Sequence, residues 1–384
     1  MITAKQRMNV LHVISALPVG GVENQLCLVL KRYDRTRIFP CVCSLSGKGE
    51  VGREIEAAGI EVVSLNKLRH GFDWSIVKDL MRVIRQRDIR VVRTHQYHAN
   101  LYGRLAAWLC RVPCIVPSIH NVYTRDRKVH RRIFNNLLGR ASDRVIAVSE
   151  AVKDDIMAYD GLSAGKITVL CNGVEEDRFA GIDAAGARSV LQIPAQDVVV
   201  GTVGRLTHQK GQKYLVEAMS AVRKEFPRIV LLIVGDGPAG NELREFVKQR
   251  GIEDSVIFTG SRGDVPAMLA AMDIFVFPSL WEGLPNALIE AMAAGKTIIA
   301  TDIKPNREVL GTEQAGVFVP SEDSAAIAAG ITQLIKDREL ALRLASAAQE
   351  RALSRFTINR TVSVYTDLFE EILGKKGRIE KAKK

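Results

Sequence analysis

Short apolar segments alternate with longer helix-like segments along almost the whole of this 384-residue chain. Such alternation is typical of α/β proteins, in which helices connect the strands of parallel sheets. Strands are predicted at 9–15, 39–45, 60–65, 90–94, 113–119, 144–148, 167–171, 197–203, 228–234, 255–259, 273–277, 296–301 and 316–319. Helices are predicted between and after them, for example at 73–87, 98–110, 211–225, 239–250, 264–271, 285–294, 323–336, 338–353 and 358–373.

The pattern breaks once and restarts with the strand-like Asp-Val-Val-Val-Gly-Thr-Val-Gly of residues 197–204. A chain of this length accommodates two domains of about 150 residues each. We therefore expect one Rossmann-like domain over 1–178 and a second over 179–357. Residues 358–384 are expected to form a helix that packs back on the N-terminal domain, with a frayed basic tail from Gly374.

The composition is that of a globular protein, with 47% hydrophobic and 25% charged residues. No apolar run approaches the roughly 20 residues needed to cross a bilayer. Lys5 and Arg7 precede an apolar run, as in a secretion signal, but the Gly-Gly-Val-Glu of 20–23 follows in place of a cleavage site. The six cysteines lie in the first half without the spacing of a zinc site, so we expect reduced thiols in a cytoplasmic protein.

The formal net charge of +11 is concentrated in the first half of the chain and in its last ten residues. This asymmetry indicates an anionic surface or partner for the first half. Residues 125–138 are basic and then apolar, a pattern shared by membrane-surface helices and by core-facing helices with a solvated start. Peripheral docking on the inner face of the plasma membrane is therefore a hypothesis.

The most informative segment for function is the Glu-Gly-Leu-Pro-Asn-Ala-Leu-Ile-Glu-Ala-Met-Ala-Ala-Gly of residues 282–295. It lies between two predicted strands, which places Glu282 at the carboxyl end of a parallel strand, where α/β sheets bind ligands. Pro285 suits the first position of a helix, and the amides of a helix start favour a phosphate. Glu290 follows on that helix, roughly 7.5 Å of rise beyond Pro285. The two carboxylates fit the sugar and the ribose of a nucleotide sugar, the alternative being an amphipathic helix with two solvated carboxylates.

Two glycine-containing segments follow predicted strands of the second half. In the first, Gly204 permits close approach of a ligand, while Arg205 and Lys210 offer a planar fork and a mobile point charge to phosphate. The alternative is two solvated surface cations. In the second, Gly235 is predicted to lie in a tight strand-to-helix turn that faces the ligand cleft.

Two further strand ends are candidates for backbone contact with a ligand. The run 256–260, which contains Ile257 and ends at Gly260, would let a planar base lie against backbone amides, unless the glycine only terminates the strand. Gly20 and Gly21 follow the first predicted strand and open a helix, so their amides are expected to face the cleft from the N-terminal domain.

Three histidines, His95, His98 and His120, lie just after predicted strands of the first half. A histidine at a strand end is either a polar cap, a core residue or a functional group. Metal binding by the three is not expected, because no carboxylate accompanies them and no Asp-x-Asp motif stands near the strand ends.

Together these residues resemble the retaining glycosyltransferase family 4 of the bacterial cell-surface glycan type, whose GT-B fold has two facing Rossmann-like domains with an interdomain cleft. The resemblance runs almost end to end. Its most specific parts are the Glu-Gly-x-Pro…Glu-Ala-x-Ala-x-Gly pattern from Glu282 and the Gly-Arg-Leu…Lys-Gly pattern from Gly204. The Asn-Gly-Val of 172–174 matches the segment between the domains, with Glu175 next. One departure is the loop 302–308, where family members often carry a Gly-Gly pair before the glutamate.

The resemblance implies a nucleotide-sugar donor on the second domain and an acceptor on the first. Arg205 and Lys210 would bind the donor diphosphate and stabilise its departure, and Glu290 would bind the ribose. Glu282 would hold the transferred sugar with the amides of Gly283 and Leu284. The other residues that this resemblance assigns are the donor-site Gly20, Gly21, Gly204, Gly235 and Ile257, the acceptor-site His95 and His98, and His120 near the reacting carbon.

The reaction implied is transfer, with retention, of a hexose or N-acetylhexosamine from a nucleotide sugar to a glycan or lipid-linked acceptor in cell-surface polysaccharide or lipopolysaccharide synthesis. Family frequency favours uridine as the base, and neither a cofactor nor a metal is expected. The alternative is a nucleotide-sugar epimerase on the same fold, which would act without an acceptor. A basic nucleic-acid-binding protein is a weaker alternative, because no recognition motif or aromatic interleaving accompanies the charge.

Overall fold

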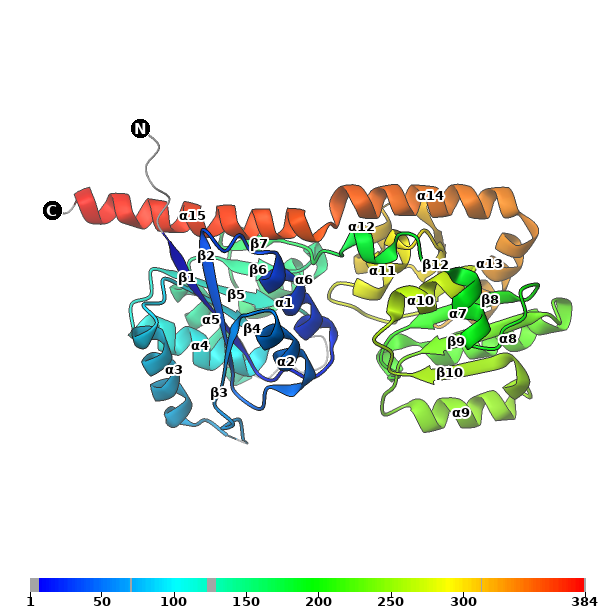
Figure 1. The fold of residues 1–384 in the computed structure, drawn as a ribbon, viewed down its shortest axis with the longest axis horizontal. Coiled ribbons are helices and arrows are strands. Elements are labelled where there is room, and N and C mark those ends of the chain that lie inside the picture. Colours follow the sequence, from blue (N-terminus) through cyan, green and yellow to red (C-terminus); the bar gives the residue numbers. More distant parts are fainter. Residues whose placement is uncertain (1–6, 70, 123–128, 312, 383–384) are drawn as a thin grey trace. The chain divides into compact units, whose positions relative to one another are not determined.

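A computed structural model describes residues 7–69, 71–122, 129–311 and 313–382 of the chain. The chain divides into two compact units: unit 1 contains residues 1–173 and 358–384, and unit 2 contains residues 174–357. Each unit is built on one parallel β-sheet with helices on both faces (Figure 1). Among the described residues, no helix is both long and apolar enough to cross a membrane.

The sheet of unit 1 has seven strands in the order β3-β2-β1-β4-β5-β6-β7, so the strand order reverses direction between β1 and β4. Ligands of open α/β sheets bind outside the carboxyl ends of the strands at such a reversal. The strands are β1 Met8–Ile14, β2 Ile38–Ser44, β3 Glu61–Ser64, β4 Val91–His95, β5 Cys114–Ile119, β6 Val145–Ala147 and β7 Ile167–Val169. The helices are α1 Gly21–Arg32, α2 Gly49–Ala57, α3 Trp74–Gln86, α4 Tyr97–Leu109, α5 Val129–Ala141, α6 Glu150–Asp155 and α15 Ile358–Ala382.

Unit 1 has a hydrophobic core on each face of its sheet, because successive side chains of a strand point to opposite faces. Val10 and Ile14 of β1 belong to the core that α1, α2 and α15 cover. Leu11 and Val13 belong to the opposite core, under α3 and α4. The last helix of the chain is therefore an integral layer of unit 1.

The sheet of unit 2 has six strands in the order β10-β9-β8-β11-β12-β13, and its order reverses between β8 and β11. The strands are β8 Val198–Val203, β9 Ile229–Val234, β10 Val256–Gly260, β11 Ile274–Phe277, β12 Thr297–Thr301 and β13 Val317–Val319. The helices are α7 Ala184–Val190, α8 Gln212–Glu225, α9 Gly240–Gln249, α10 Val265–Ala271, α11 Asn286–Ala293, α12 Lys304–Leu310, α13 Ser324–Lys336 and α14 Arg338–Arg355. The loops after β8 and β11 thus lie where a ligand of this unit is expected.

The predicted α/β fold is confirmed, and every predicted strand is present within two residues of its predicted ends. The prediction of a frayed tail from Gly374 is wrong, because α15 continues through that glycine to Ala382. Lys375 pairs with Glu371 one turn earlier, and the Nζ atom of Lys376 lies 2.6 Å from the Oδ1 atom of Asp143. These ion pairs, together with the good helix propensity of lysine, partly offset the cost of Gly374 and Gly377, which is about 1 kcal/mol for each glycine in a helix interior.

Candidate functional site

Three loops at the carboxyl ends of unit 2 strands are packed backbone to backbone. An added Cβ atom at Gly235 would lie 2.1 Å from the carbonyl oxygen of Gly204, and one at Gly211 would lie 2.1 Å from that of Pro278. Both glycines have positive φ angles, 132° and 63°. The loops after β8, β9 and β11 can therefore converge only because side chains are missing at these positions. At Gly204 itself an added Cβ would meet only Lys210 methylenes, the nearest at 3.8 Å.

Two of the predicted donor residues form a buried ion pair in these loops. The Nζ atom of Lys210 lies 2.5 Å from the Oε1 atom of Glu282, whose side chain is only 6% exposed. The ammonium also lies 5.2 Å from the ring centroid of Phe277. A buried carboxylate needs such a partner, since an unpaired charge is costly away from water. Lys210 is therefore held beside Glu282, the residue that the family resemblance assigns to the sugar.

The loops that carry this ion pair are also tied together by Gln209, which the sequence analysis did not single out. The Gln209 side chain donates to the carbonyl of Trp281 at 2.8 Å, and the amide of Leu280 donates to the carbonyl of Gln209 at 2.8 Å. These two hydrogen bonds hold the loop of Lys210 and the loop of Glu282 together. A glutamine between a histidine and a lysine gives no sequence signal for such a role.

Helix α11 begins at Asn286, one residue later than predicted, with Pro285 as its N-cap. The Pro285 carbonyl accepts the amides of Leu288 at 3.0 Å and Ile289 at 3.2 Å. In the described part of the chain, no side chain caps this helix start. The amide of Asn286 donates to the carbonyl of Leu284 at 3.0 Å, so it is the positive end of the helix dipole that suits an anion here. The buried Gly283 and Leu284 lead the chain into this helix start.

Glu290 lies in the second turn of α11 and is half-buried. Burial raises the pKa of its carboxyl to about 7, although Arg178 acts in the opposite direction. Arg178 belongs to unit 2, in a short 3₁₀ helix at Glu176–Phe179, whereas the sequence analysis placed it in the first domain. A carboxyl that titrates near neutrality is typical of functional sites.

Two further predicted donor residues, Arg205 and Ile257, lie in different surroundings. The Arg205 side chain is exposed, and its carbonyl accepts the Gln212 amide at 3.1 Å. Ile257 lies inside β10, opposite Leu232 of β9, so it is not at the strand end. Gly260, with φ 68°, is at that end and its carbonyl accepts the amide of Gly235 at 2.9 Å.

The loop 302–308, where the chain departs from the family pattern, is fastened by the fully buried Asn306. Its amide donates to the carbonyl of Thr301 at 2.9 Å and to the hydroxyl of Thr301 at 3.1 Å. The Thr301 hydroxyl in turn donates to the carbonyl of Ser279, in the loop after β11. A side-chain network thus joins the start of α12 to the loop that leads to Glu282.

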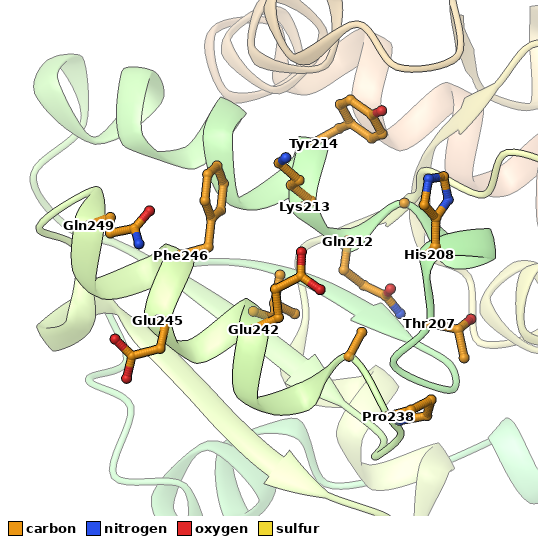
Figure 2. Close-up of a pocket in the computed structure, with 13 residues that line it drawn as sticks. Thr207, His208, Gln212, Lys213, Tyr214, Pro238, Glu242, Glu245, Phe246 and Gln249 are labelled. Carbon is orange, nitrogen blue, oxygen red and sulfur yellow. The ribbon is translucent and has the colours of Figure 1, made fainter.

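A cavity of about 680 Å³ lies between the start of α8 and the length of α9, from Ala239 to Gln249 (Figure 2). Gly211 and Gln212, which follow Lys210, contribute to its walls, together with the side chains of Tyr214 and Phe246. None of the predicted donor residues lines it. The cavity is therefore distinct from the group of predicted donor residues.

In unit 1, Gly20 makes room for the carboxylate of Glu23 at the start of α1. An added Cβ atom at Gly20 would lie 2.3 Å from the Oε2 atom of Glu23, whereas Gly21 is exposed. Gln96, directly after β4, donates to the Oε1 atom of Glu23 at 2.5 Å. Gln96 has a φ of 69°, a strained value for a residue other than glycine. Burial raises the pKa of Glu23.

In the structure His95 contacts His120, whereas no hydrogen bond or ring contact links it to His98 among the described residues. The Nδ1 atom of His95 lies 3.3 Å from the Nε2 atom of His120, and the Nε2 atom of His95 lies 3.2 Å from the Nδ1 atom of His12. His98 is exposed on α4, with its ring edge-on to Tyr97. The sequence analysis missed His12, although a polar residue in the middle of an apolar strand is a signal that could have identified it.

The cysteines and histidines do not form a metal site in the described residues, where no group of three or more His, Cys, Asp and Glu side chains could hold an ion. None of the six cysteines, all of which lie in the described residues, forms a disulfide. Burial raises the pKa of Cys41 and of Cys43 to about 12, so these thiols are unreactive at neutral pH.

Helix α5 exposes an apolar stripe. Its side chains Val129, Ile133 and Leu137 are 73%, 53% and 58% exposed, and Phe134 is 48% exposed. The inner side of the helix is formed by the buried Asn135 and Gly139. These four apolar side chains therefore do not face the core, whereas Leu138 is half-buried. The first part of the predicted segment, at 125–128, lies outside the described residues.

Two family models match the chain and together span most of it. The model described as "Glycosyltransferase Family 4" matches residues 19–178, and the model described as "Glycosyl transferases group 1" matches residues 185–351. Residues Glu282 and Glu290, Arg205 and Lys210 all fall within the second match. The family resemblance that the motifs indicated is therefore confirmed.

Similar proteins agree with these matches. The UDP-Gal:alpha-D-GlcNAc-diphosphoundecaprenol alpha-1,3-galactosyltransferase of Escherichia coli is 27% identical over 315 residues, which cover 78% of this chain and 81% of that protein. The lipopolysaccharide core biosynthesis mannosyltransferase LpsB of Rhizobium meliloti is 29% identical over 57% of this chain and 66% of its own length. The crystal structure of Anabaena HepE in complex with UDP and glucose superposes with a TM-score of 0.85 at 24% identity, covering 95% of this chain and all of that one. At that identity, the superposition establishes the fold.

Proposed function

Because the chain belongs to the group 1 glycosyltransferases of the GT-B fold, we propose that it transfers a hexose or N-acetylhexosamine from a UDP-linked donor with retention of the anomeric configuration. The acceptor that we propose is a lipid-linked glycan of bacterial cell-surface polysaccharide or lipopolysaccharide synthesis. This choice is supported by the E. coli relative, whose name specifies a diphosphoundecaprenol acceptor, and by the R. meliloti relative, which is named for lipopolysaccharide core biosynthesis.

The observation that carries the donor assignment is the buried pair of Lys210 and Glu282 in front of an uncapped helix start, with Glu290 one to two turns along that helix. An ammonium and the positive end of a helix dipole fit a diphosphate. A carboxylate on either side fits the hydroxyl groups of a sugar and of a ribose. We propose that the arriving diphosphate draws Lys210 from Glu282 and thereby frees this carboxylate to accept hydrogen bonds from the sugar.

The proposed chemistry relies on charge stabilisation. Negative charge grows on the leaving nucleotide diphosphate as the bond from its oxygen to the anomeric carbon breaks. Arg205, Lys210 and the positive end of the α11 dipole would neutralise that charge without a metal ion. An oxygen of the departing phosphate would receive the proton of the acceptor hydroxyl, which attacks from the same face, so that no protein nucleophile is needed. His120, the position that matches the family's histidine, would donate a hydrogen bond to the transferred sugar.

The test of the donor site is thermal unfolding of the wild-type protein with UDP, GDP and ADP sugars, repeated on Glu290→Ala and Arg205→Ala. A ligand that binds only the native state raises Tm, so we expect the largest rise with a UDP sugar and a smaller rise in both variants. Glu350→Ala and Arg343→Ala, at exposed positions of α14, are matched controls that should retain the full rise. Equal rises in all five proteins would refute the site.

A further inference from the structure

A line of polar side chains crosses the otherwise apolar face of the unit 1 sheet beneath α1 and α15. His12 of β1 lies opposite Arg93 of β4, and His95 of β4 lies opposite Ser118 of β5. These four side chains are between 0% and 3% exposed. The line ends at the half-buried His120, directly after β5. Buried polar groups are costly unless they are hydrogen-bonded, so the connections within the line are informative.

The three histidines of the line form a continuous hydrogen-bonded chain. The Nδ1 atom of His12 is 3.2 Å from the Nε2 atom of His95, and the Nδ1 atom of His95 is 3.3 Å from the Nε2 atom of His120. Their rings are stacked, with centroids 5.6 Å and 5.5 Å apart. Each contact joins the same pair of atom types, Nδ1 to Nε2, so one proton arrangement can run through the whole chain.

The imidazoles of the chain are neutral at physiological pH. Burial and the positive charge of Arg93 lower the pKa of His12 and His95 well below the usual value of 6.5 and lower that of His120 to about 3. A neutral imidazole has one N–H donor and one acceptor nitrogen. Only two arrangements then satisfy both contacts: every ring carries its proton on Nδ1, or every ring carries it on Nε2.

His12, at the other end of the hydrogen-bonded histidines from His120, distinguishes the two proton arrangements. The Nε2 atom of His12 is buried and has no hydrogen-bond partner among the described residues. Protons on Nε2 would leave a buried N–H donor without an acceptor, close to a guanidinium cation. Protons on Nδ1 leave only an unused lone pair there, which is the less costly defect. The Nδ1–H arrangement is therefore the favoured one, and it leaves the Nδ1–H of His120 outside the chain.

We infer that His12 and His95 are positioning residues that hold His120 in its Nδ1–H tautomer, so that His120 presents an N–H donor to an oxygen of the bound sugar. This inference rests on the proposed function for the identity of the ligand, but the tautomer itself does not depend on it. A His120 held in this way orients a hydroxyl or stabilises negative charge on oxygen. It does not accept a proton from the substrate through that nitrogen.

The first test is long-range ¹H–¹⁵N correlation NMR of the wild-type protein labelled with ¹⁵N in its histidine rings. This spectrum distinguishes the protonated nitrogen of each ring from the bare one. We expect His12, His95 and His120 to carry the proton on Nδ1, although histidine free in water favours Nε2. A wild-type His120 protonated on Nε2 would overturn the inference, whatever the activity of the enzyme.

The second test compares two substitutions of nearly equal shape, His12→Asn and His12→Asp. The amide of asparagine can replace the Nδ1–H donor of His12, whereas an aspartate beside Arg93 only accepts. We expect His12→Asn to leave the His120 tautomer unchanged and His12→Asp to move its proton to Nε2. Transfer by His12→Asp should then fall roughly a hundred-fold, as on loss of one positioned donor, with little change in KM for the nucleotide sugar.

Binding of UDP sugar by unit 2 and the near-ultraviolet circular dichroism spectrum provide the folding control for both substitutions. A folded His12→Asp protein with an unchanged His120 tautomer contradicts the inference. If the His120 proton moves to Nε2 but transfer is unaffected, the hydrogen-bonded chain of histidines exists and the proposed role of His120 in the reaction is wrong. The failure of the inference and the failure of the proposed function are thus separate outcomes.

Discussion

Glu290 carries a charge that depends on pH in the neutral range. Its pKa is raised to about 7 by burial, so the carboxyl is largely protonated at pH 6 and largely ionised at pH 8. The two hydroxyls of a ribose would donate hydrogen bonds to it, and donors favour the ionised form. Binding of the donor should therefore release a proton from this carboxyl.

We predict that affinity for a UDP sugar is about tenfold higher at pH 8 than at pH 6, because only the ionised form of Glu290 accepts both hydrogen bonds. The diphosphate of the sugar nucleotide does not titrate in this range. Isothermal titration calorimetry at a series of pH values measures the change. Glu290→Gln keeps a hydrogen-bonding side chain that does not titrate, and its affinity should be independent of pH; a slope equal to that of wild type would show that another group is responsible.

The proximity of Lys210 and Glu282 is the kind of contact that a sequence predicts well. Both residues follow strands that meet at the point where the sheet order reverses, so topology alone brings their loops together. The contribution of His12 could not be predicted in this way. It depends on which strand pairs with β1 and in what register, and no local pattern specifies that His12 lies beside Arg93.

At the scale of elements, the sequence of α5 is compatible with a membrane-surface helix and with a core-facing helix. A helix that faces a core would bury Ile133 and Leu137, but both are more than half exposed. Burial of two such side chains in an interface is worth about 1.5–3 kcal/mol each, and each nearby basic residue adds about 1 kcal/mol at an anionic leaflet. The surface interpretation is therefore the one that we adopt for a lipid-linked acceptor.

We predict that the double substitution Ile133→Ser and Leu137→Ser reduces binding to anionic vesicles at least tenfold in a flotation assay, because the apolar stripe no longer inserts. The same pair of changes at Leu342 and Leu353, which are exposed on α14, is the matched control and should leave flotation unchanged. Equal flotation of the wild-type protein with anionic and with neutral vesicles would exclude the electrostatic part of this docking.

Helices and strands were predicted correctly where neighbouring residues in the sequence determine them. Strands of parallel sheets are short apolar runs between helices, and this pattern placed all of them correctly. The end of α15 was missed because glycine at 374 suggests a helix end, whereas a contact with Asp143, more than two hundred residues earlier, supports the helix beyond it. Such long-range contacts are absent from any local window of sequence.

At the scale of the whole chain, α15 is the segment on which unit 1 most depends. Its Tyr365 and Phe369 are 1% and 0% exposed, and the Tyr365 ring lies 3.6 Å from the guanidinium carbon of the buried Arg93. Removing one buried aromatic side chain costs about 3–5 kcal/mol. Removing the helix would also leave the Arg93 cation without its aromatic partner.

We predict that a chain ending at Thr357 loses the folded state of unit 1, while unit 2 still binds a UDP sugar. Calorimetry should show one of two thermal transitions missing, with the remaining one still raised by the ligand. A chain that ends at Gly377 retains every residue of α15 whose burial the structure describes and should show both transitions. Two transitions in the shorter chain would mean that α15 is dispensable to unit 1.

The return of the chain to unit 1 also fixes an order of events on the ribosome. Unit 2 is one uninterrupted stretch, from 174 to 357, and is fully synthesised before the first residue of α15 exists. The first residues of unit 1 are made before unit 2, but unit 1 lacks a layer of its core until α15 has been translated. Unit 2, whose translation begins second, is thus the first that can reach its native state, and the N-terminal part of unit 1 must await α15, exposed to chaperones in the meantime.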